Sequence, residues 1–195
     1  MEHNLTQHLS QLSQQQQKEL LRQARQVIAK GCSRSLPPEP DHNNQPAVFL
    51  QHGACFVTLH KHGELRGCIG SIEAHRPLLD DVMHHAFASA FRDHRFPPVQ
   101  QTELADLHIE ISILTPKQKM QVASEAELLR NLRPNIDGLL IQSSLYTATF
   151  LPQVWEQLPE PELFLTHLKQ KAGMPSNEWP EDIACYKYQC NYFHE

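Results

Sequence analysis

Residues 65–70 read Leu-Arg-Gly-Cys-Ile-Gly, and this stretch decides how the neighbouring chain is expected to fold. Most of it has the character of a buried β-strand, but Gly67 and Gly70 carry no side chain where a strand normally packs one. Glycine weakens the interior of a strand unless another backbone or a ligand must approach closely there. The stretch therefore predicts a strand with a close neighbour, either protein backbone or a ligand.

Arg66 and Cys68 carry the chemistry of this stretch. They are two positions apart, so the alternation of a strand would place both on one face, with their Cα atoms about 6.8 Å apart. A guanidinium at that distance favours a thiolate over a thiol and would lower the pKa of Cys68. The pair is therefore a candidate site, with Cys68 as its reactive group.

The preceding run, 56–60, is apolar and β-branched, and we expect it to form a hairpin with the glycine-containing strand. We favour a three-residue loop, 61–63, in which Gly63 adopts the left-handed conformation of a bulge. A two-residue loop would mix Arg66 and Cys68 with the apolar face, and that conflict argues against it. The favoured register pairs His60 with Glu64, Thr58 with Arg66 and Phe56 with Cys68.

The composition limits the class of protein. The chain has 195 residues, enough for one domain, and its net charge of −5 gives no general attraction to phosphate, so we expect no nucleic-acid binding. No apolar run approaches the roughly 20 residues of a membrane span, and the N-terminus lacks the apolar core of an export signal, so we expect a cytosolic protein. We expect residues 1–16 to be a mobile polar extension and residues 17–195 a single domain.

Cysteine and histidine are numerous but form no ligand pattern. The five cysteines are an odd number without a C-x-x-C pair, so we expect reduced thiols. His60 and His62 flank a predicted turn, and His84 and His85 point in different directions on a predicted helix, so we expect no bound metal. The glycines of 65–70 precede no phosphate-binding helix, and we expect no nucleotide cofactor.

Hydrophobic periodicity predicts alternating helices and strands. Ser13 is expected to cap a helix that closes at Gly31, and Pro77 to begin a second helix. Strict alternation makes 107–114 the clearest half-buried strand. These elements predict an α+β fold in which helices pack on a sheet. Further helices are expected near 124–132 and at 161–172, and further strands at 139–142, 146–151 and 185–193.

A dense cluster of charge, residues 92–95, follows the second predicted helix. Asp93 is expected to hold Arg92 or Arg95 in place, so that either arginine can bind an anion. The alternative is a surface-exposed helix end whose charges serve solubility. The sequence alone leaves both interpretations open.

Several motifs, in their order along the chain, resemble the AMMECR domain family, called AmmeMemoRadiSam system protein A in prokaryotes. The resemblance covers about residues 17–193, and its most specific motifs are the run ending at 65–70 and the segment starting at Thr149. The matching residues are Phe56-Val57-Thr58-Leu59, Leu65-Arg66-Gly67-Cys68-Ile69-Gly70, Phe91-Arg92-Asp93, Arg95-Phe96-Pro97-Pro98, Ile109-Glu110-Ile111-Ser112, Asp137-Gly138-Leu139, Thr149-Phe150-Leu151-Pro152-Gln153-Val154-Trp155 and Lys171-Ala172-Gly173.

The resemblance implies an α+β fold with a mixed, largely antiparallel sheet and a small subdomain near the glycine-rich hairpin. It also implies a genetic association with two partners: a Memo-type protein, similar to non-haem iron dioxygenases, and a radical S-adenosylmethionine (SAM) enzyme. The family has no established activity, and the usual proposal places its functional surface at the segment that is 65–70 here.

Two functions of different classes fit these residues. A binding module, which we favour, would receive a peptide or modified side chain from the Memo-type or radical SAM enzyme, with Arg66 pairing a carboxylate or phosphate. An enzyme would use Cys68 as thiolate nucleophile or carrier, with Arg66 as its electrostatic partner or an anion clamp. The plainer alternative is a tight core turn in which Arg66 satisfies backbone carbonyls and Cys68 packs against Phe56.

The candidate residues follow from these functions. In the enzyme, Gly67 and Gly70 would make room for substrate, and an acid or base would come from His60, Glu64 or Glu110. Substrate, reaction type and oligomeric state are left open. The catalytic candidates are Cys68, Arg66 and Glu110, and the candidates for binding substrate or partner are Arg66, Gly67, Gly70, His60, Glu64, Asp93 and Arg95.

Overall fold

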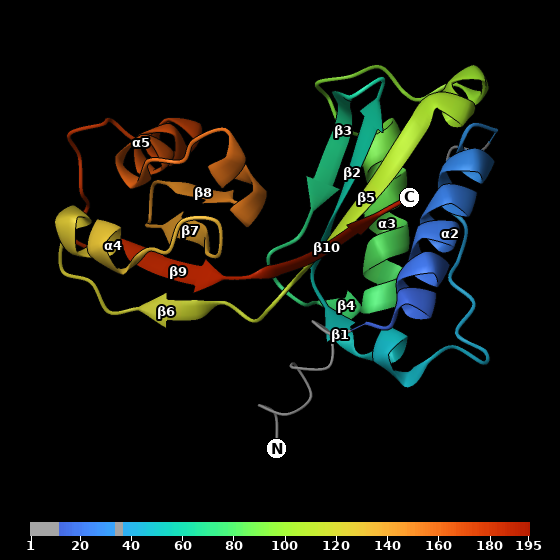
Figure 1. The fold of residues 1–195 in the computed structure, drawn as a ribbon, viewed down its shortest axis with the longest axis horizontal. Coiled ribbons are helices and arrows are strands. Elements are labelled where there is room, and N and C mark those ends of the chain that lie inside the picture. The colour runs from blue at the N-terminus through green and yellow to red at the C-terminus, as the bar shows by residue number, and fades with distance from the viewer. Residues whose placement is uncertain (1–11, 34–36) are drawn as a thin grey trace. The chain divides into compact units, whose positions relative to one another are not determined.

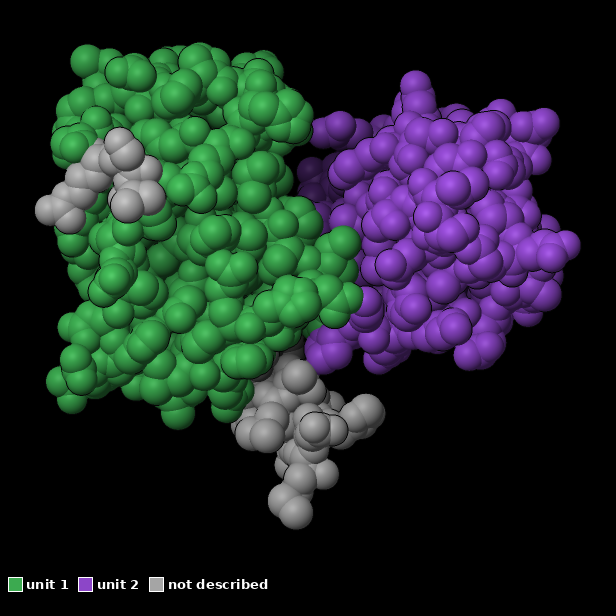
Figure 2. Space-filling view, turned by 180° about the vertical axis from the view of Figure 1, so that it is seen from behind, with its two compact units in different colours: residues 1–115, 191–195 green, residues 116–190 purple. Residues whose placement is uncertain are grey.

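The structure is a computed structural model that describes residues 12–33 and 37–195. The chain forms two compact units (Figure 2). Unit 1 comprises the described residues up to Thr115 together with 191–195, and unit 2 comprises 116–190. The expected α+β class is confirmed. Most of the expected extension, residues 1–11, lies outside the described residues.

Unit 1 is a four-stranded sheet with two long helices packed against it (Figure 1). The strand order is β10-β5-β2-β3, and the glycine-rich hairpin is formed by β2 and β3. The core lies between the sheet and the helices, where Leu20, Val57 and Val82 are buried. The elements are α2 (Gln14–Gly31), η1 (Ala47–Leu50), β1 (His52–Gly53), β2 (Cys55–Lys61), β3 (Glu64–Gly70), β4 (Arg76–Pro77), α3 (Leu78–Phe91), η2 (Gln101–Asp106), β5 (Leu107–Leu114) and β10 (Cys190–His194).

Both ends of α2 lie where the sequence predicts them. The Ser13 hydroxyl accepts a hydrogen bond from the Gln16 backbone N–H, and the Gln16 side chain accepts from the Ser13 N–H, which forms a capping box. Gly31 is the last residue of the helix, but it is not left-handed. A Cβ there would lie 2.2 Å from the Phe91 ring, so this glycine lets α2 and α3 pack closely.

The close neighbour predicted for the glycine-rich strand is the backbone of α3. A Cβ at Gly67 would lie 2.2 Å from the Ser89 carbonyl oxygen. The buried Ser89 hydroxyl accepts a hydrogen bond from the Ile69 N–H (2.9 Å) and donates one to the Val57 carbonyl (2.7 Å). Helix α3 is therefore bonded directly to the backbones of both hairpin strands, and Gly67 makes that approach sterically possible.

Unit 2 has its own sheet, with strand order β6-β9-β7-β8, and its own core. Trp155 stacks on Phe164 with ring centroids 3.8 Å apart, and its indole N–H donates to the carbonyl of Asp137. The Asp137 carboxylate is buried and accepts from the backbone and guanidinium of Arg133. The elements are β6 (Gln118–Met120), α4 (Glu125–Asn131), β7 (Gly138–Gln142), β8 (Thr147–Phe150), η3 (Pro152–Glu156), α5 (Pro161–Lys171) and β9 (Ala184–Tyr188).

The single last strand predicted at 185–193 is wrong. The segment forms two strands, β9 in the sheet of unit 2 and β10 in the sheet of unit 1, with Gln189 between them. An extended chain can leave one sheet and enter another without a turn, so alternation along the sequence does not mark the change. The resemblance implied a small subdomain near the hairpin; the smaller unit of the structure is 116–190, and the hairpin lies in unit 1. No helix in the described part of the chain is long and apolar enough to cross a membrane.

Replacing Gly67 by Ala should lower the free energy of unfolding by about 1–3 kcal/mol, because the new methyl group collides with helix backbone that no side-chain rotation can move. Urea unfolding at equilibrium measures this loss. Gly63 is the matched control, because it has φ +84° with open space around its Cα, and asparagine tolerates this conformation. Gly63→Asn should cost less than Gly67→Ala, because it meets only the mild strain of a positive φ and no collision, and equal stability of the two variants would contradict the close-approach explanation.

Candidate functional site

The β2–β3 hairpin has a two-residue turn, so the predicted three-residue loop is wrong. His62 and Gly63 have φ values of 53° and 84°, the two positive values of a turn that matches the twist of the strands. Lys61 pairs with Glu64 and His60 with Leu65. The remaining pairs are Leu59 with Gly67, Thr58 with Cys68, Val57 with Ile69 and Phe56 with Gly70.

A β-bulge at Arg66 resolves the conflict that argued against the short turn. Arg66 is the extra residue between the pairs His60–Leu65 and Leu59–Gly67. The bulge shifts the following residues by one position, so that Gly67 returns to the buried side of the sheet opposite Leu59. It also interrupts the alternation between Arg66 and Cys68, so a shared face no longer follows from their spacing.

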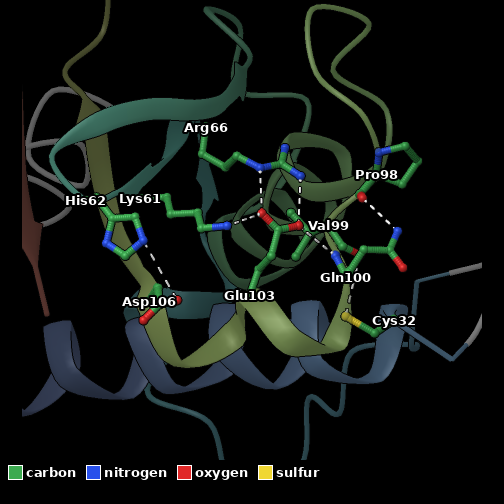
Figure 3. Close-up of polar contacts among 9 residues, drawn as sticks. All are labelled: Cys32, Lys61, His62, Arg66, Pro98, Val99, Gln100, Glu103 and Asp106. Atoms are coloured by element: carbon green, nitrogen blue, oxygen red, sulfur yellow. Dashed lines mark hydrogen bonds and ion pairs between the residues drawn. The ribbon is translucent and has the colours of Figure 1, made fainter.

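Arg66 forms a bidentate ion pair with Glu103 of η2, as Figure 3 shows. Its Nε and Nη2 atoms each lie 3.1 Å from a carboxylate oxygen of Glu103. Lys61 Nζ lies 2.9 Å from Oε1, and the Gln100 N–H donates to Oε2. The hydrogen bonds from Arg66 are the main cause that lowers the pKa of Glu103 to about 2, although burial acts in the opposite direction. Glu103 is therefore a carboxylate at neutral pH.

The rest of the Arg66 guanidinium is also enclosed by protein. Only 11% of its side chain is exposed, and its carbon Cζ lies 6.0 Å from the centroid of the Phe96 ring. Nη1 is buried and has no hydrogen-bond partner among the described residues. Arg66 is thus held by Glu103 and Phe96 and offers little accessible charge, unlike the anion clamp expected from the sequence.

Cys68 is held at its backbone by the segment that follows α3. The Asp93 carboxylate accepts a hydrogen bond from the Cys68 N–H (2.9 Å), and Arg95 Nη2 donates to the Cys68 carbonyl (3.1 Å). Arg95 Nε and Nη2 also donate to the Asp93 carboxylate. These Arg95 bonds chiefly hold the pKa of Asp93 well below its usual range, against the effect of burial, and the Cys68 N–H adds to them. The expected pair of Asp93 with Arg95 is confirmed.

The Cys68 sulfur lies in a polar row that crosses three strands. The Thr58 hydroxyl donates a hydrogen bond to it over 3.3 Å. Thr58 pairs with Cys68 on one side and with Glu110 of β5 on the other. Because neighbouring strands lie about 4.8 Å apart, the Cys68 and Glu110 backbones are roughly 9.6 Å apart. The fold therefore brings two of the three catalytic candidates to one row, while Arg66 pairs with Glu103.

The other candidate residues surround this row. His60, half-buried, pairs with Leu65 and with His108, and Glu64 is exposed beside the turn. Gly70 lies opposite Phe56, and a Cβ there would be 2.3 Å from that ring. The space at Gly67 and Gly70 is thus filled by protein, by the α3 backbone and the Phe56 ring respectively.

Sequence reasoning missed two residues that shape the site, Ser89 and Glu103, and it placed Thr58 opposite Arg66 instead of Cys68. Gln100 and Glu103 are three residues apart, which is the spacing of a capping box at the start of a helix. This spacing predicts that the Glu103 side chain bonds to the backbone of Gln100, so it was an available signal for Glu103. Nothing in the sequence indicates that Ser89 bonds to the hairpin, because an isolated serine in an apolar helix has many alternatives. Thr58 follows only from the correct register.

Replacing Glu103 by Gln should lower the free energy of unfolding at pH 7 by about 1–3 kcal/mol, because the enclosed Arg66 loses its charged partner. The folded pKa of about 2 lies below the ordinary value of 4.5, so this stabilisation is fully present above pH 4.5 and is lost as the pH falls toward 2. Urea unfolding of both proteins across this range measures the difference.

Asp106 supplies the control for this variant. It is also in η2, but its ion pair with His62 spans 3.9 Å between exposed side chains (Figure 3). Asp106→Asn should therefore change stability by less than about 0.5 kcal/mol. A Glu103 variant as stable as this control would mean that the Arg66–Glu103 pair does not anchor the hairpin.

Within residues 12–33 and 37–195 no group of three or more His, Cys, Asp or Glu side chains is arranged to hold a metal ion.

Comparison with known proteins identifies the family. A family model described as AMMECR1 matches residues 21–193. A protein of Methanothermobacter thermautotrophicus is 39% identical over 152 residues, which is 77% of this chain and 79% of that protein. Protein PH0010 of Pyrococcus horikoshii is 34% identical over 187 residues, 90% of this chain and 88% of its own.

A solved structure leads to the same family. The crystal structure described as uncharacterized protein PH0010 from Pyrococcus horikoshii superimposes with a TM-score of 0.86 and 32% sequence identity, covering 94% of this chain and 93% of that one. The family model, the relatives and this structure all extend over most of the chain, so the chain belongs to the AMMECR1 family.

Proposed function

We propose that this protein is a cytosolic binding or accessory module that recognises an anionic group on a partner protein. We name the proposed contact region the β3-edge surface; it comprises Cys68, Asp93, Arg95 and Phe96, beside the glycine-rich strand. The proposed partners are a Memo-type protein and a radical SAM enzyme, the pair whose genetic association the family resemblance implies. The observation that supports this proposal is the position of Arg95 in the structure.

Arg95 is a preorganised and accessible cation. Its Nε and Nη2 atoms bond to the buried Asp93 carboxylate, and Nη2 also bonds to the Cys68 carbonyl, so the guanidinium is held in one orientation. Yet 47% of its side chain is exposed. A fixed guanidinium loses little entropy when it binds a carboxylate or phosphate, which favours recognition. Of Arg66 and Arg95, both anion-binding candidates from the sequence, we therefore assign this role to Arg95.

Arg66 supports this surface as a positioning residue. Its Cζ atom lies 6.0 Å and that of Arg95 5.4 Å from the centroid of the same Phe96 ring. The Arg66–Glu103 pair fixes the bulge beside that ring. Two guanidinium groups therefore flank one aromatic side chain. Each is paired with a carboxylate, Arg66 with Glu103 and Arg95 with Asp93, but only Arg95 is exposed to a partner.

A second candidate function, an enzyme that uses Cys68, is favoured by one observation. The Thr58 hydroxyl donates to the Cys68 sulfur, and such a donor stabilises a thiolate more than a thiol. The charge of Arg95 also interacts with Cys68, and Glu110 stands in the same row as a candidate acid or base. In this function Cys68 is the nucleophile or carrier, and Arg95 replaces Arg66 as its electrostatic partner.

Replacing Arg95 by Gln should weaken capture of the purified Memo-type or radical SAM partner at least tenfold, because a hydrogen bond to a charged group contributes about 1.5–3 kcal/mol. Affinity measured by calorimetry or surface plasmon resonance tests this. Arg92→Gln is the matched control, since Arg92 is also exposed and lies three residues earlier, over the Phe87 ring. Equal affinity of both variants, with unchanged melting temperature, would exclude Arg95 as the recognition residue.

For the enzyme, Cys68 should react with iodoacetamide with a pH midpoint clearly below the free-thiol value of about 8.5. Mass spectrometry of the modified peptide separates Cys68 from the other four cysteines. Thr58→Val removes the hydroxyl donor and should raise the midpoint, whereas Thr58→Ser should preserve it. A wild-type midpoint at or above the free-thiol value, or complete protection, would remove Cys68 as a nucleophile.

A further inference from the structure

Strand β3 stands at one end of the strand order of its sheet. An edge strand presents backbone N–H and C=O groups that can pair with a strand of another molecule. Edges are commonly protected by Lys or Pro, and β3, with the sequence Glu-Leu-Arg-Gly-Cys-Ile-Gly, contains neither. The bulge at Arg66 and the charges of Glu64 and Arg66 lie in the first half of β3, so protection of its second half must come from elsewhere in the fold.

The outward-facing backbone of Cys68 is covered by two side chains instead of a strand. Asp93 accepts from its N–H and Arg95 donates to its C=O, the same pair of bonds that a neighbouring strand would make. The Asp93 carboxylate is 1% exposed, and its position is set by Arg95 and by the end of α3. Asp93 and Arg95 are therefore held over the Cys68 backbone by the fold itself.

Unit 2 has the same kind of cover at its own edge. Strand β8 stands at one end of that sheet, and Lys171 at the end of α5 donates to the carbonyl of Thr149 over 3.0 Å. In both units a charged side chain that follows or ends a packed helix reaches over the edge strand. The presence of such a side chain in both sheets supports the interpretation that these side chains protect the edge strands.

We propose that Asp93 and Arg95 form an edge guard that prevents β3 from pairing with β3 of a second copy of this chain. Without the guard, two β3 strands can pair antiparallel about Cys68, with the two Cys68 residues directly opposite. Their Cα atoms would then be about 5.5 Å apart, within the Cα range of a disulfide, and a small local shift would bring the Cβ atoms to bonding distance. A disulfide between the two Cys68 residues would therefore reveal this pairing of β3 strands.

Asp93→Ala tests the guard on the purified full-length chain, with wild type beside it. Light scattering measures the mass, and diamide, which takes two electrons and two protons from a pair of thiols, forms the disulfide. We expect a larger mass for the variant and a several-fold higher yield of the Cys68–Cys68 peptide, identified by mass spectrometry. Adding Cys68→Ser should abolish this peptide while the larger mass of the variant persists, and neither mass nor yield should rise in the exposed control Arg92→Ala.

Circular dichroism establishes whether the variant is folded. A folded Asp93→Ala protein with wild-type mass and no additional Cys68–Cys68 peptide overturns the guard. If Asp93→Ala does not fold, Arg95→Ala, which uncovers only the Cys68 carbonyl, is judged by the same two measurements. Because both use the purified chain alone, their result is independent of whether Arg95 binds a partner protein.

Discussion

The close contact of α3 with the glycine-rich strand is the constraint on which the rest of unit 1 depends. With no Cβ at Gly67, the Ser89 carbonyl can sit against β3 and the Ser89 hydroxyl can bond to both strands of the hairpin. Asp93 lies four residues after Ser89 and just beyond the end of α3, so the same approach carries Asp93 and Arg95 to the Cys68 backbone. One missing methyl group thus determines both the packing of the helix and the chemistry at the edge of the sheet.

Two ion pairs connect irregular segments to this strand. Arg66 joins the bulge to η2 through Glu103, and Asp93 with Arg95 joins the segment after α3 to Cys68. Buried pairs of this kind add little net stability compared with apolar packing, but breaking one leaves an uncompensated charge. Their effect is to select one arrangement of loops and strand. The β3-edge surface is therefore rigid although much of it lies outside regular elements.

The same arrangement explains why the two arginines differ in accessibility. Both lie near Phe96, yet Arg66 is 11% exposed and paired with a carboxylate that stays ionised, whereas the side chain of Arg95 is 47% exposed. A partner can reach Arg95 without displacing protein groups. The Cys68 backbone is held by Asp93 and Arg95, and the Cys68 sulfur accepts a hydrogen bond from Thr58. The proposed anion recognition would use the Arg95 guanidinium, and the proposed thiol chemistry would use the sulfur of Cys68.

The sequence by itself determined the α+β class, the capped start of α2, the alternating strand β5 and the close neighbour of Gly67, because periodicity, capping and the absence of a side chain are local properties. Tertiary structure decided the turn of the hairpin, the bulge at Arg66, the partner of that arginine and the division of the last strand between two sheets. A bulge changes the pairing of every later residue without a sequence signal of its own. The partner of a long charged side chain depends on which distant segment folds beside it, and that is settled only when helix and sheet pack together.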